Sequence, residues 1–294
     1  DDVVPSASIG YKLTDMSNLR LGYNMRIYRP GIWYLNPYLN DTDPSYISQG
    51  NSELDSEKSH AFNLSYSNFT QKFNINLSAR YSFTNNSIEN VTKLMPDTEI
   101  EGLKNPTGKD VLYSTYANIG KTRRASVSAY VNWNATPRTR IYMNMSGDYS
   151  YMEGSEGMRN DGWSLFAYGG AQQTLPHDWR ISLNVFGQTP WIMLQGKGSS
   201  FFDYGLSVNK SFLNKRLTLS AFASNFFKKY MDQSSTTEGA GFIRESSYKY
   251  SRQRFGISVS YRIGELKASV KKAARTISND DVKSGGSGSG GGGE

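Results

Sequence analysis

Apolar and polar side chains alternate along most of this 294-residue chain. In "KFNINLSARYSF" (72–83), Phe73, Ile75 and Leu77 alternate with asparagine and serine. A period of two residues predicts a β-strand with one apolar and one polar face. The pattern recurs and predicts eleven strands, over residues 6–13, 18–28, 60–68, 71–83, 124–134, 138–151, 162–174, 179–188, 201–210, 216–226 and 253–263.

The connections between these strands alternate between short and long. Five are tight turns, at residues 14–18, 67–71, 134–138, 175–179 and 212–216, and five are long, at 29–58, 84–123, 152–161, 189–200 and 227–252. An antiparallel meander with all short turns at one end is typical of an outer-membrane β-barrel, whose turns are periplasmic and whose long loops are extracellular. A soluble sandwich or jelly roll has no reason to sort its loops, and a propeller or solenoid would repeat at a fixed period.

The length of the strands agrees with a membrane barrel. Several predicted strands have ten or more residues, and a tilted strand needs about 9 to 11 to cross a bilayer. Aromatic residues lie near many strand ends, as the two aromatic girdles of a barrel require. We therefore expect lipid to cover the face of Phe73 and a polar lumen to contact the face of Asn74. The mean hydropathy of −0.58 follows, because half of each strand and all loops are polar.

Composition excludes several kinds of chemistry. The chain has no cysteine, which excludes disulfides, thiol catalysis and zinc sites with thiolate ligands. Its two histidines, His60 and His177, lie at opposite ends of the predicted barrel, so we expect no metal site, no cofactor and no enzymatic activity. Basic and aromatic residues occupy opposite faces of the same strands, so a nucleic-acid partner is not expected.

The strand count predicts that the barrel continues beyond this chain. Single-chain bacterial barrels usually have an even number of strands, whereas plugged outer-membrane transporters have about 22. Eleven strands would be half of such a barrel. We therefore expect either its C-terminal half or one chain of a split barrel, with residues 1–264 forming strands and loops. Residues 265–294, which end in a Gly/Ser-rich run, are expected to form a disordered periplasmic tail.

The first long connection carries a motif. It reads R-P, then L-N-P, then G-N followed by a leucine and a glutamate. The matching residues are Arg29, Pro30, Leu35, Asn36, Pro37, Gly50, Asn51, Leu54 and Glu57. This motif resembles the barrel of TonB-dependent transporters, especially the Bacteroidota outer-membrane β-barrel family, although Ser52 and Ser56 replace the usual prolines. Residues 175–196 and 255–264 are also similar to that family.

The resemblance implies energised uptake of a nutrient ligand through a barrel closed by an N-terminal plug domain. Neither the plug nor a TonB box is recognisable in these residues. The expected partners are outer-membrane lipid, the N-terminal barrel half, the plug, TonB through the N-terminal region, and a surface lipoprotein. The expected location is the outer membrane of a Gram-negative bacterium, with a periplasmic C-terminus. A passive porin or a structural barrel subunit of a surface complex is the alternative.

Arginines are predicted on the polar face of the strands, where they would line the lumen. The plug-facing candidates are Arg80, Arg138, Arg140, Arg180 and Arg254. One interpretation is that they pair with carboxylates on the plug, since arginine suits bidentate partners. The alternative is that they pair with Asp148 and its neighbours within the wall, or contact water.

Aromatic residues of the long loops are the candidates for ligand contact. They are Trp33, Tyr34, Tyr38 and Tyr46 in the first long connection and Trp191 in a later one. Rigid amphipathic rings suit binding surfaces. The alternative is that these rings pack the loops against themselves.

Overall fold

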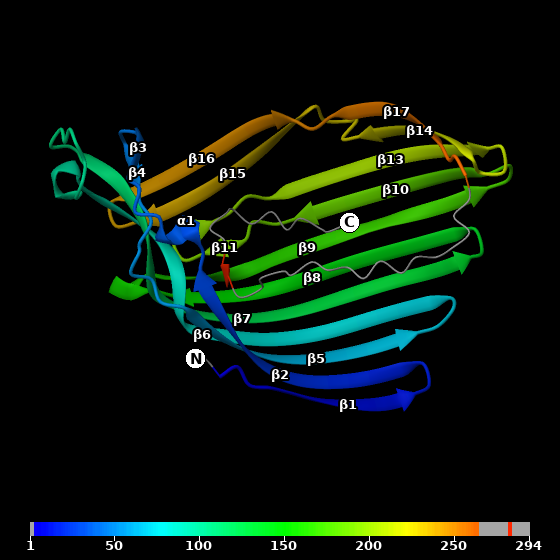
Figure 1. Ribbon diagram of the computed structural model, residues 1–294, viewed down its shortest axis with the longest axis horizontal. Coiled ribbons are helices and arrows are strands. Elements are labelled where there is room, and N and C mark those ends of the chain that lie inside the picture. The colour runs from blue at the N-terminus through cyan, green and yellow to red at the C-terminus, as the bar shows by residue number, and fades with distance from the viewer. Residues whose placement is uncertain (1–2, 265–281, 284–294) are drawn as a thin grey trace.

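The main sheet of the protein is an antiparallel meander. The computed structural model describes residues 3–264 and 282–283. Eleven strands follow one another in chain order across the sheet (Figure 1): β1 (Ser6–Thr14), β2 (Ser17–Pro30), β5 (Glu57–Phe69), β6 (Phe73–Pro96), β7 (Asp110–Thr136), β8 (Thr139–Glu153), β9 (Arg159–Leu175), β10 (Trp179–Gln188), β13 (Phe201–Phe212), β14 (Leu217–Ser224) and β17 (Arg254–Tyr261). Each overlaps one of the eleven predicted strands, so the predicted all-β antiparallel meander is confirmed.

The long connections contain further elements, which all lie at one end of the sheet (Figure 1). They are α1 (Ile32–Leu35), β3 (Asn40–Asp43), β4 (Tyr46–Ser48), η1 (Asp97–Glu99), η2 (Ser155–Gly157), β11 (Ile192–Met193), β12 (Gly196–Lys197), β15 (Tyr230–Gly239) and β16 (Phe242–Ser251). Strands β11, β12, β15 and β16 form a second sheet in that order. None of the helices in the described part of the chain is long and apolar enough to span a membrane.

Residues 84–123 and 227–252 were predicted only as long connections, and the structure shows strands in both. β6 continues to Pro96 and β7 begins at Asp110, and the two stay paired across a register shift between Thr84 and Ser87. The segment 227–252 forms the β15–β16 hairpin. Beyond the membrane, a strand has no lipid-covered face, so its ladder of hydrogen bonds persists without the strict apolar alternation that identifies a spanning strand.

The short turns lie at the opposite end of the sheet. Between β9 and β10, His177 and Asp178 both have positive φ, 60° and 58°. Leu175 pairs with Trp179, so only three residues separate the two strands, as in a short hairpin loop. The sorting of short and long connections to opposite ends, predicted from the sequence, is confirmed (Figure 1).

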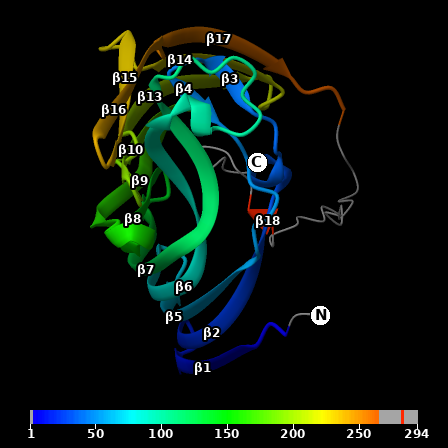
Figure 2. The ribbon, with the colours of Figure 1, turned by 90° about the vertical axis from the view of Figure 1, so that its left-hand side faces the viewer.

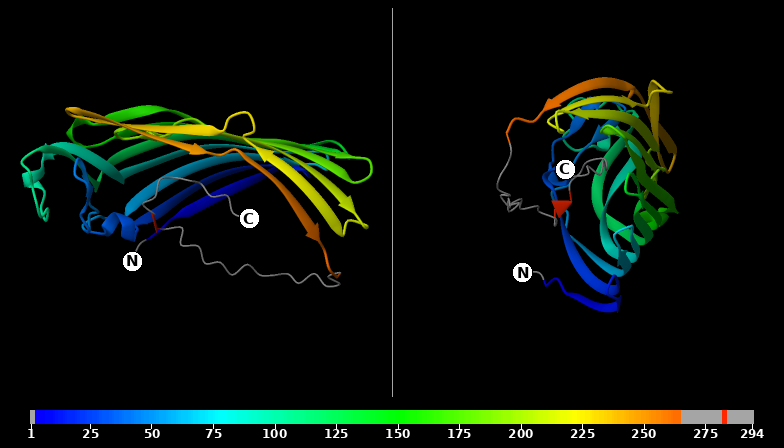
Figure 3. Two further views of the ribbon diagram at one scale, coloured as in Figure 1. Left: turned by 90° about the horizontal axis from the view of Figure 1, so that it is seen from above. Right: turned by 90° about the vertical axis from the view of Figure 1, so that its right-hand side faces the viewer.

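The sheet curves into an open trough, as Figures 2 and 3 show. β1 and β17 form its two edges, and each pairs with only one neighbour in the main sheet. The described strands are therefore one part of a barrel wall. Whether the whole wall has 22 strands stays a prediction.

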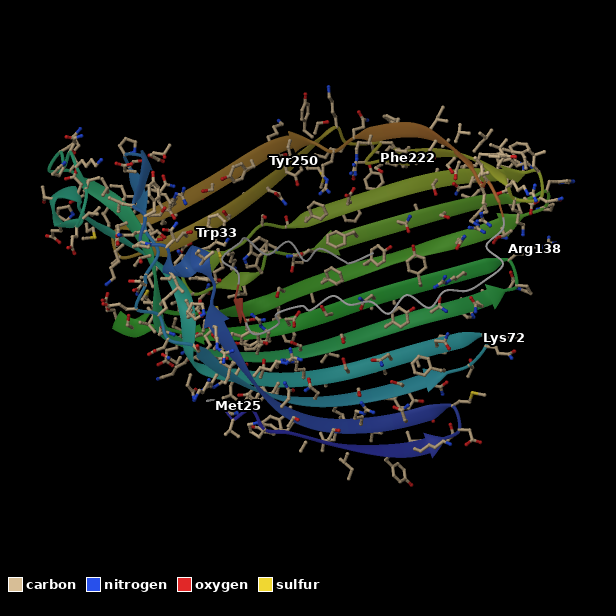
Figure 4. The ribbon with its side chains drawn as sticks, viewed as in Figure 1. Met25, Trp33, Lys72, Arg138, Phe222 and Tyr250 are labelled. Carbon is tan, nitrogen blue, oxygen red and sulfur yellow. The ribbon has the colours of Figure 1, made fainter. Side chains whose placement is uncertain are left out.

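Register assigns the two faces. On the convex face, Leu64, Ala79 and Val127 occupy adjacent strands in one row, followed by Gly147 and Leu165. On the concave face, Ser65, Ser78, Ser128 and Ser146 form the adjacent row. Figure 4 looks into the concave side and shows its polar groups. The apolar face points outward, as a barrel in a membrane requires.

The height of the apolar band fits a bilayer. The outward residues of β8 are uncharged from Ile141 to Tyr151. That run covers about 33 Å of strand at roughly 3.3 Å per residue, or about 25 Å of height at a tilt of roughly 40°. Aromatic residues lie at both limits. Tyr149 contacts Trp163 at the loop end, with ring centroids 5.4 Å apart, and Phe73 pairs with Trp133 near the turn end.

The predicted tail lies almost wholly outside the described residues. Only β18 (Val282–Lys283) is described, and it pairs in parallel with Arg29 and Pro30. Those two residues are at the end of β2 that enters the first long connection. The periplasmic location and disorder of residues 265–294 stay predictions.

The assignment of the faces is tested with nitroxide labels in lipid vesicles. Labels at the outward positions Leu77 and Met143 should be relaxed by lipid-soluble oxygen and protected from an aqueous nickel complex. Labels at the inward neighbours Asn76 and Asn144 should show the opposite preference, because they contact the lumen. Aqueous access at Leu77 and Met143 would contradict the membrane assignment.

Candidate functional site

The long loops form a packed cap at one end of the trough. Tyr34 in α1 is only 7% exposed and lies in a cluster with Leu54 and Ile88. Its ring meets the ring of Tyr116 edge-on, with centroids 4.5 Å apart. Burial, with the nearby Tyr116, raises the pKa of Tyr34 to about 12. The first long connection is therefore fixed onto the extended β6–β7 hairpin.

Two further contacts join loops that are distant in sequence. The guanidinium of Arg244 in β16 lies over the Tyr46 ring, 3.8 Å from its centroid. The side chain of Gln195, which is buried, accepts a hydrogen bond from Thr92 N at 2.7 Å and donates one to Thr92 O at 2.9 Å. The last long connection is thereby tied to the first, and the fourth is tied to the second.

Asp97 closes the tip of the β6–β7 hairpin. Its Oδ2 accepts hydrogen bonds from the N–H and hydroxyl of Thr107, at 2.6 and 2.8 Å, and its Oδ1 accepts one from Gly108 N at 2.8 Å. These donors, above all the backbone N–H of Thr107, lower the pKa of Asp97. The carboxylate therefore has a structural role in shaping the tip.

The five aromatic candidates for ligand contact have different environments. Trp33 and Tyr38 are each 69% exposed, and Trp33 belongs to α1 at the loop end (Figure 4). Tyr34 is buried, Tyr46 is covered by Arg244, and Trp191 is half-buried against Gly198. The packing alternative thus describes Tyr34, whereas Trp33 and Tyr38 present free ring surface.

The predicted lumen arginines are exposed and occupy different places on the concave side. Arg80 and Arg140 lie within β6 and β8, Arg180 lies near the turn end of β10, and Arg254 begins β17. Arg138 was expected on the wall, but it lies in the tight turn between β7 and β8 (Figure 4). The turn places it at the rim of the trough.

Arg140 contacts an amide and a ring of the wall. Arg140 Nε donates to Asn132 Oδ1 at 2.7 Å, and its guanidinium lies 5.7 Å from the centroid of the Tyr142 ring. Asp148 instead accepts hydrogen bonds from the hydroxyls of Ser126 and Ser146. Within residues 3–264, none of the five arginines forms an ion pair with a carboxylate, so the alternative of pairing with Asp148 is not what the structure shows.

A group of rings on the concave face was missed from the sequence. Tyr142 contacts Tyr168 at 5.8 Å between centroids, and Phe186 contacts Phe166 at 5.3 Å and Phe201 at 5.0 Å. Each ring occupies a polar-face position of its own strand, which was visible in the alternation. Their proximity depends on the register of β8, β9, β10 and β13, which no single strand reveals.

The described residues contain no group of three or more His, Cys, Asp or Glu side chains that could hold a metal ion.

The model of the outer membrane protein beta-barrel family matches residues 1–261. The chain belongs to this family. Membership of the family agrees with the lipid-facing apolar band and places the chain in the outer membrane. No curated protein matches the sequence.

Solved structures of outer-membrane receptors share the fold of this family member. The siderophore receptor PirA from Pseudomonas aeruginosa has 17% identity and a TM-score of 0.56, with 77% of this chain and 39% of that chain covered. The copper transporter OprC has 14% identity and a TM-score of 0.59, with 87% of this chain and 40% of that chain covered. A mutant of the ferric enterobactin receptor PfeA from Pseudomonas aeruginosa has 16% identity and a TM-score of 0.54, covering 88% and 40%.

These likenesses establish the barrel fold. The matched regions amount to 39–40% of the length of these solved chains, so this chain spans about two fifths of their length.

The burial of Tyr34 predicts an alkaline transition in the cap. Its pKa is about 12 in the folded state against about 10 when exposed, so the stability that neutral Tyr34 contributes is complete below pH 10 and is lost as pH rises through 12. The tyrosinate difference spectrum of wild type minus Tyr34→Phe should titrate near pH 12. Between pH 10 and 12, raising the pH should lower the unfolding temperature of the variant less than that of the wild type. A midpoint near 10 would contradict the burial of Tyr34.

Proposed function

We propose that the chain is the C-terminal barrel portion of a TonB-dependent importer of the Bacteroidota type, with its lumen closed by a plug domain. The main support is the concave wall, where the five candidate arginines form no ion pair with a carboxylate among the described residues. The motif at 29–57 and the similarity to receptor barrels add to it.

The electrostatics of a closed barrel favour a charged occupant. Arg80, Arg180 and Arg254 are exposed in the open trough, where water solvates them. Once the wall closes and a domain fills the lumen, these cations lose much of that water, and burying them unpaired would be costly. Carboxylates on the occupant would meet the guanidinium groups with bidentate hydrogen bonds. A plug with acidic residues on its surface satisfies this requirement.

The sheet edges support a partner that supplies more strands. β1 and β17 each leave one side of their backbone without a strand in the main sheet. Lipid offers no hydrogen bonds, so an edge within the bilayer must be paired. The N-terminal half of the barrel is the partner we propose, and TonB and a surface lipoprotein remain proposals that follow from the resemblance.

Ligand contact is proposed for the exposed loop rings. Trp33 and Tyr38 lie at the end of the trough that we assign to the cell exterior, and both expose most of their surface. Of the structurally similar proteins, PirA is a siderophore receptor and OprC is a copper transporter. The concave rings, including Tyr142 and Tyr168, lie deeper on the wall and would contact the plug or a ligand passing it.

The import proposal is tested on the complete protein in planar bilayers. The wild type should show no steady open pore, because the plug closes it. In the double variant Arg80→Ala with Arg140→Ala, the ion pairs that hold the plug are removed. The plug should therefore be released at a lower urea concentration than in the wild type, and an open conductance should appear. Lys72→Ala with Lys210→Ala, two cations at the turn end, is the matched control. A steady conductance in the wild type would instead indicate a passive porin.

A further inference from the structure

The convex face of β7, β8 and β9 changes abruptly in charge along its length. The outward positions between Ala125 and Trp133, between Ile141 and Tyr151, and between Trp163 and Leu175 carry no charge. The next outward positions toward the loops are all charged: they are Lys121, Arg123, Glu153, Arg159 and Asp161. These five residues therefore lie immediately beyond the apolar band, at the level of the lipid headgroups.

Aromatic rings hold the two arginines against the wall. The Arg123 guanidinium lies 5.4 Å from the centroid of Phe83, and the His60 ring stacks on Phe83 at 4.8 Å and 13°. The Arg159 guanidinium lies 4.8 Å from the centroid of Tyr151. Both cations are thus fixed on outward-facing rings of the girdle and present their remaining N–H groups to the membrane surface.

The carboxylates of this region leave the cations in excess. Lys121 contacts Glu153 at 3.3 Å and Arg159 contacts Asp161 at 3.9 Å, and all four side chains are at least 40% exposed. Exposed pairs of this kind are weak in water. Arg123 donates to Asn85 Oδ1 at 2.8 Å and to two carbonyl groups, and it has no carboxylate in ion-pair contact within the described part of the chain.

We propose that Lys121, Arg123 and Arg159, here called the girdle patch, bind the phosphate groups of a lipid in the outer leaflet. The guanidinium fork matches phosphate oxygens, and the rings beneath it keep that fork in place. The lipid chains would lie on the uncharged rows directly below. The patch is on the outward face, so its occupant is independent of any ligand in the lumen.

The opposite end of the same strands has no such patch. Trp133, Ile141 and Leu175 occupy the outward positions there. The nearest comparable cation is Lys210 on β13, which lies 5.4 Å from the Trp179 ring and 5.3 Å from the Phe212 ring. The girdle patch therefore selects for one leaflet, and Lys210 provides a cation with a similar aromatic setting at the other membrane surface.

The proposal is tested by lipid binding to the complete protein in phosphatidylcholine nanodiscs. Native mass spectrometry would compare retention of phosphorylated lipid A with that of the same lipid after enzymatic removal of its phosphates. The wild type should retain the phosphorylated form preferentially. Arg123→Gln with Arg159→Gln should weaken its retention roughly tenfold, as expected when two charge-assisted contacts are lost.

Lys72→Gln with Lys210→Gln is the matched control and should retain the lipid as the wild type does. Equal retention of the two lipid forms by the wild type would overturn the proposal, and this comparison requires no variant to fold. An equal loss in the control and in the Arg123 and Arg159 variant would also overturn it, because it would show general attraction to cations.

Discussion

The backbone hydrogen bonds between neighbouring strands are the constraint on which the rest of the structure depends. In hydrocarbon, each N–H and C=O must find a partner within the protein, and an antiparallel meander supplies one on both sides of every inner strand. Once the ladder is set, the pleat directs alternate side chains to opposite faces. Lipid and lumen then impose different chemistry on the two faces, which is why Leu77 and Asn76 are adjacent in sequence but separated by the wall.

The same constraint explains what the sequence could predict. The spanning strands were recognised because lipid demands an apolar residue at every second position, and the sorting of turns follows from strands that all cross one membrane. The strands beyond it were missed, since residues 85–96 and 110–123 have no lipid-covered face to impose a period. Packing of the loop rings was one of two alternatives for Tyr34, but its partners Leu54, Ile88 and Tyr116 come from separate segments and could not be predicted.

The candidate sites show the same division. The arginines of the concave wall could be assigned to a face from the pleat alone, except Arg138, which a turn removes from the wall. The ring contacts between Tyr142 and Tyr168 and between Phe166 and Phe186 required the register of neighbouring strands. The two hydrogen bonds between Gln195 and Thr92 join residues 103 positions apart, and no local pattern predicts them.

The β6–β7 hairpin has a consequence for how the cell surface is met from outside. Its strands have 24 and 27 residues, more than twice what a bilayer needs. The excess carries the tip shaped by Asp97 well above the headgroups. In the orientation proposed above, with the long loops on the cell exterior, a large particle such as a phage or an antibody would meet this projection before it reached the mouth of the barrel.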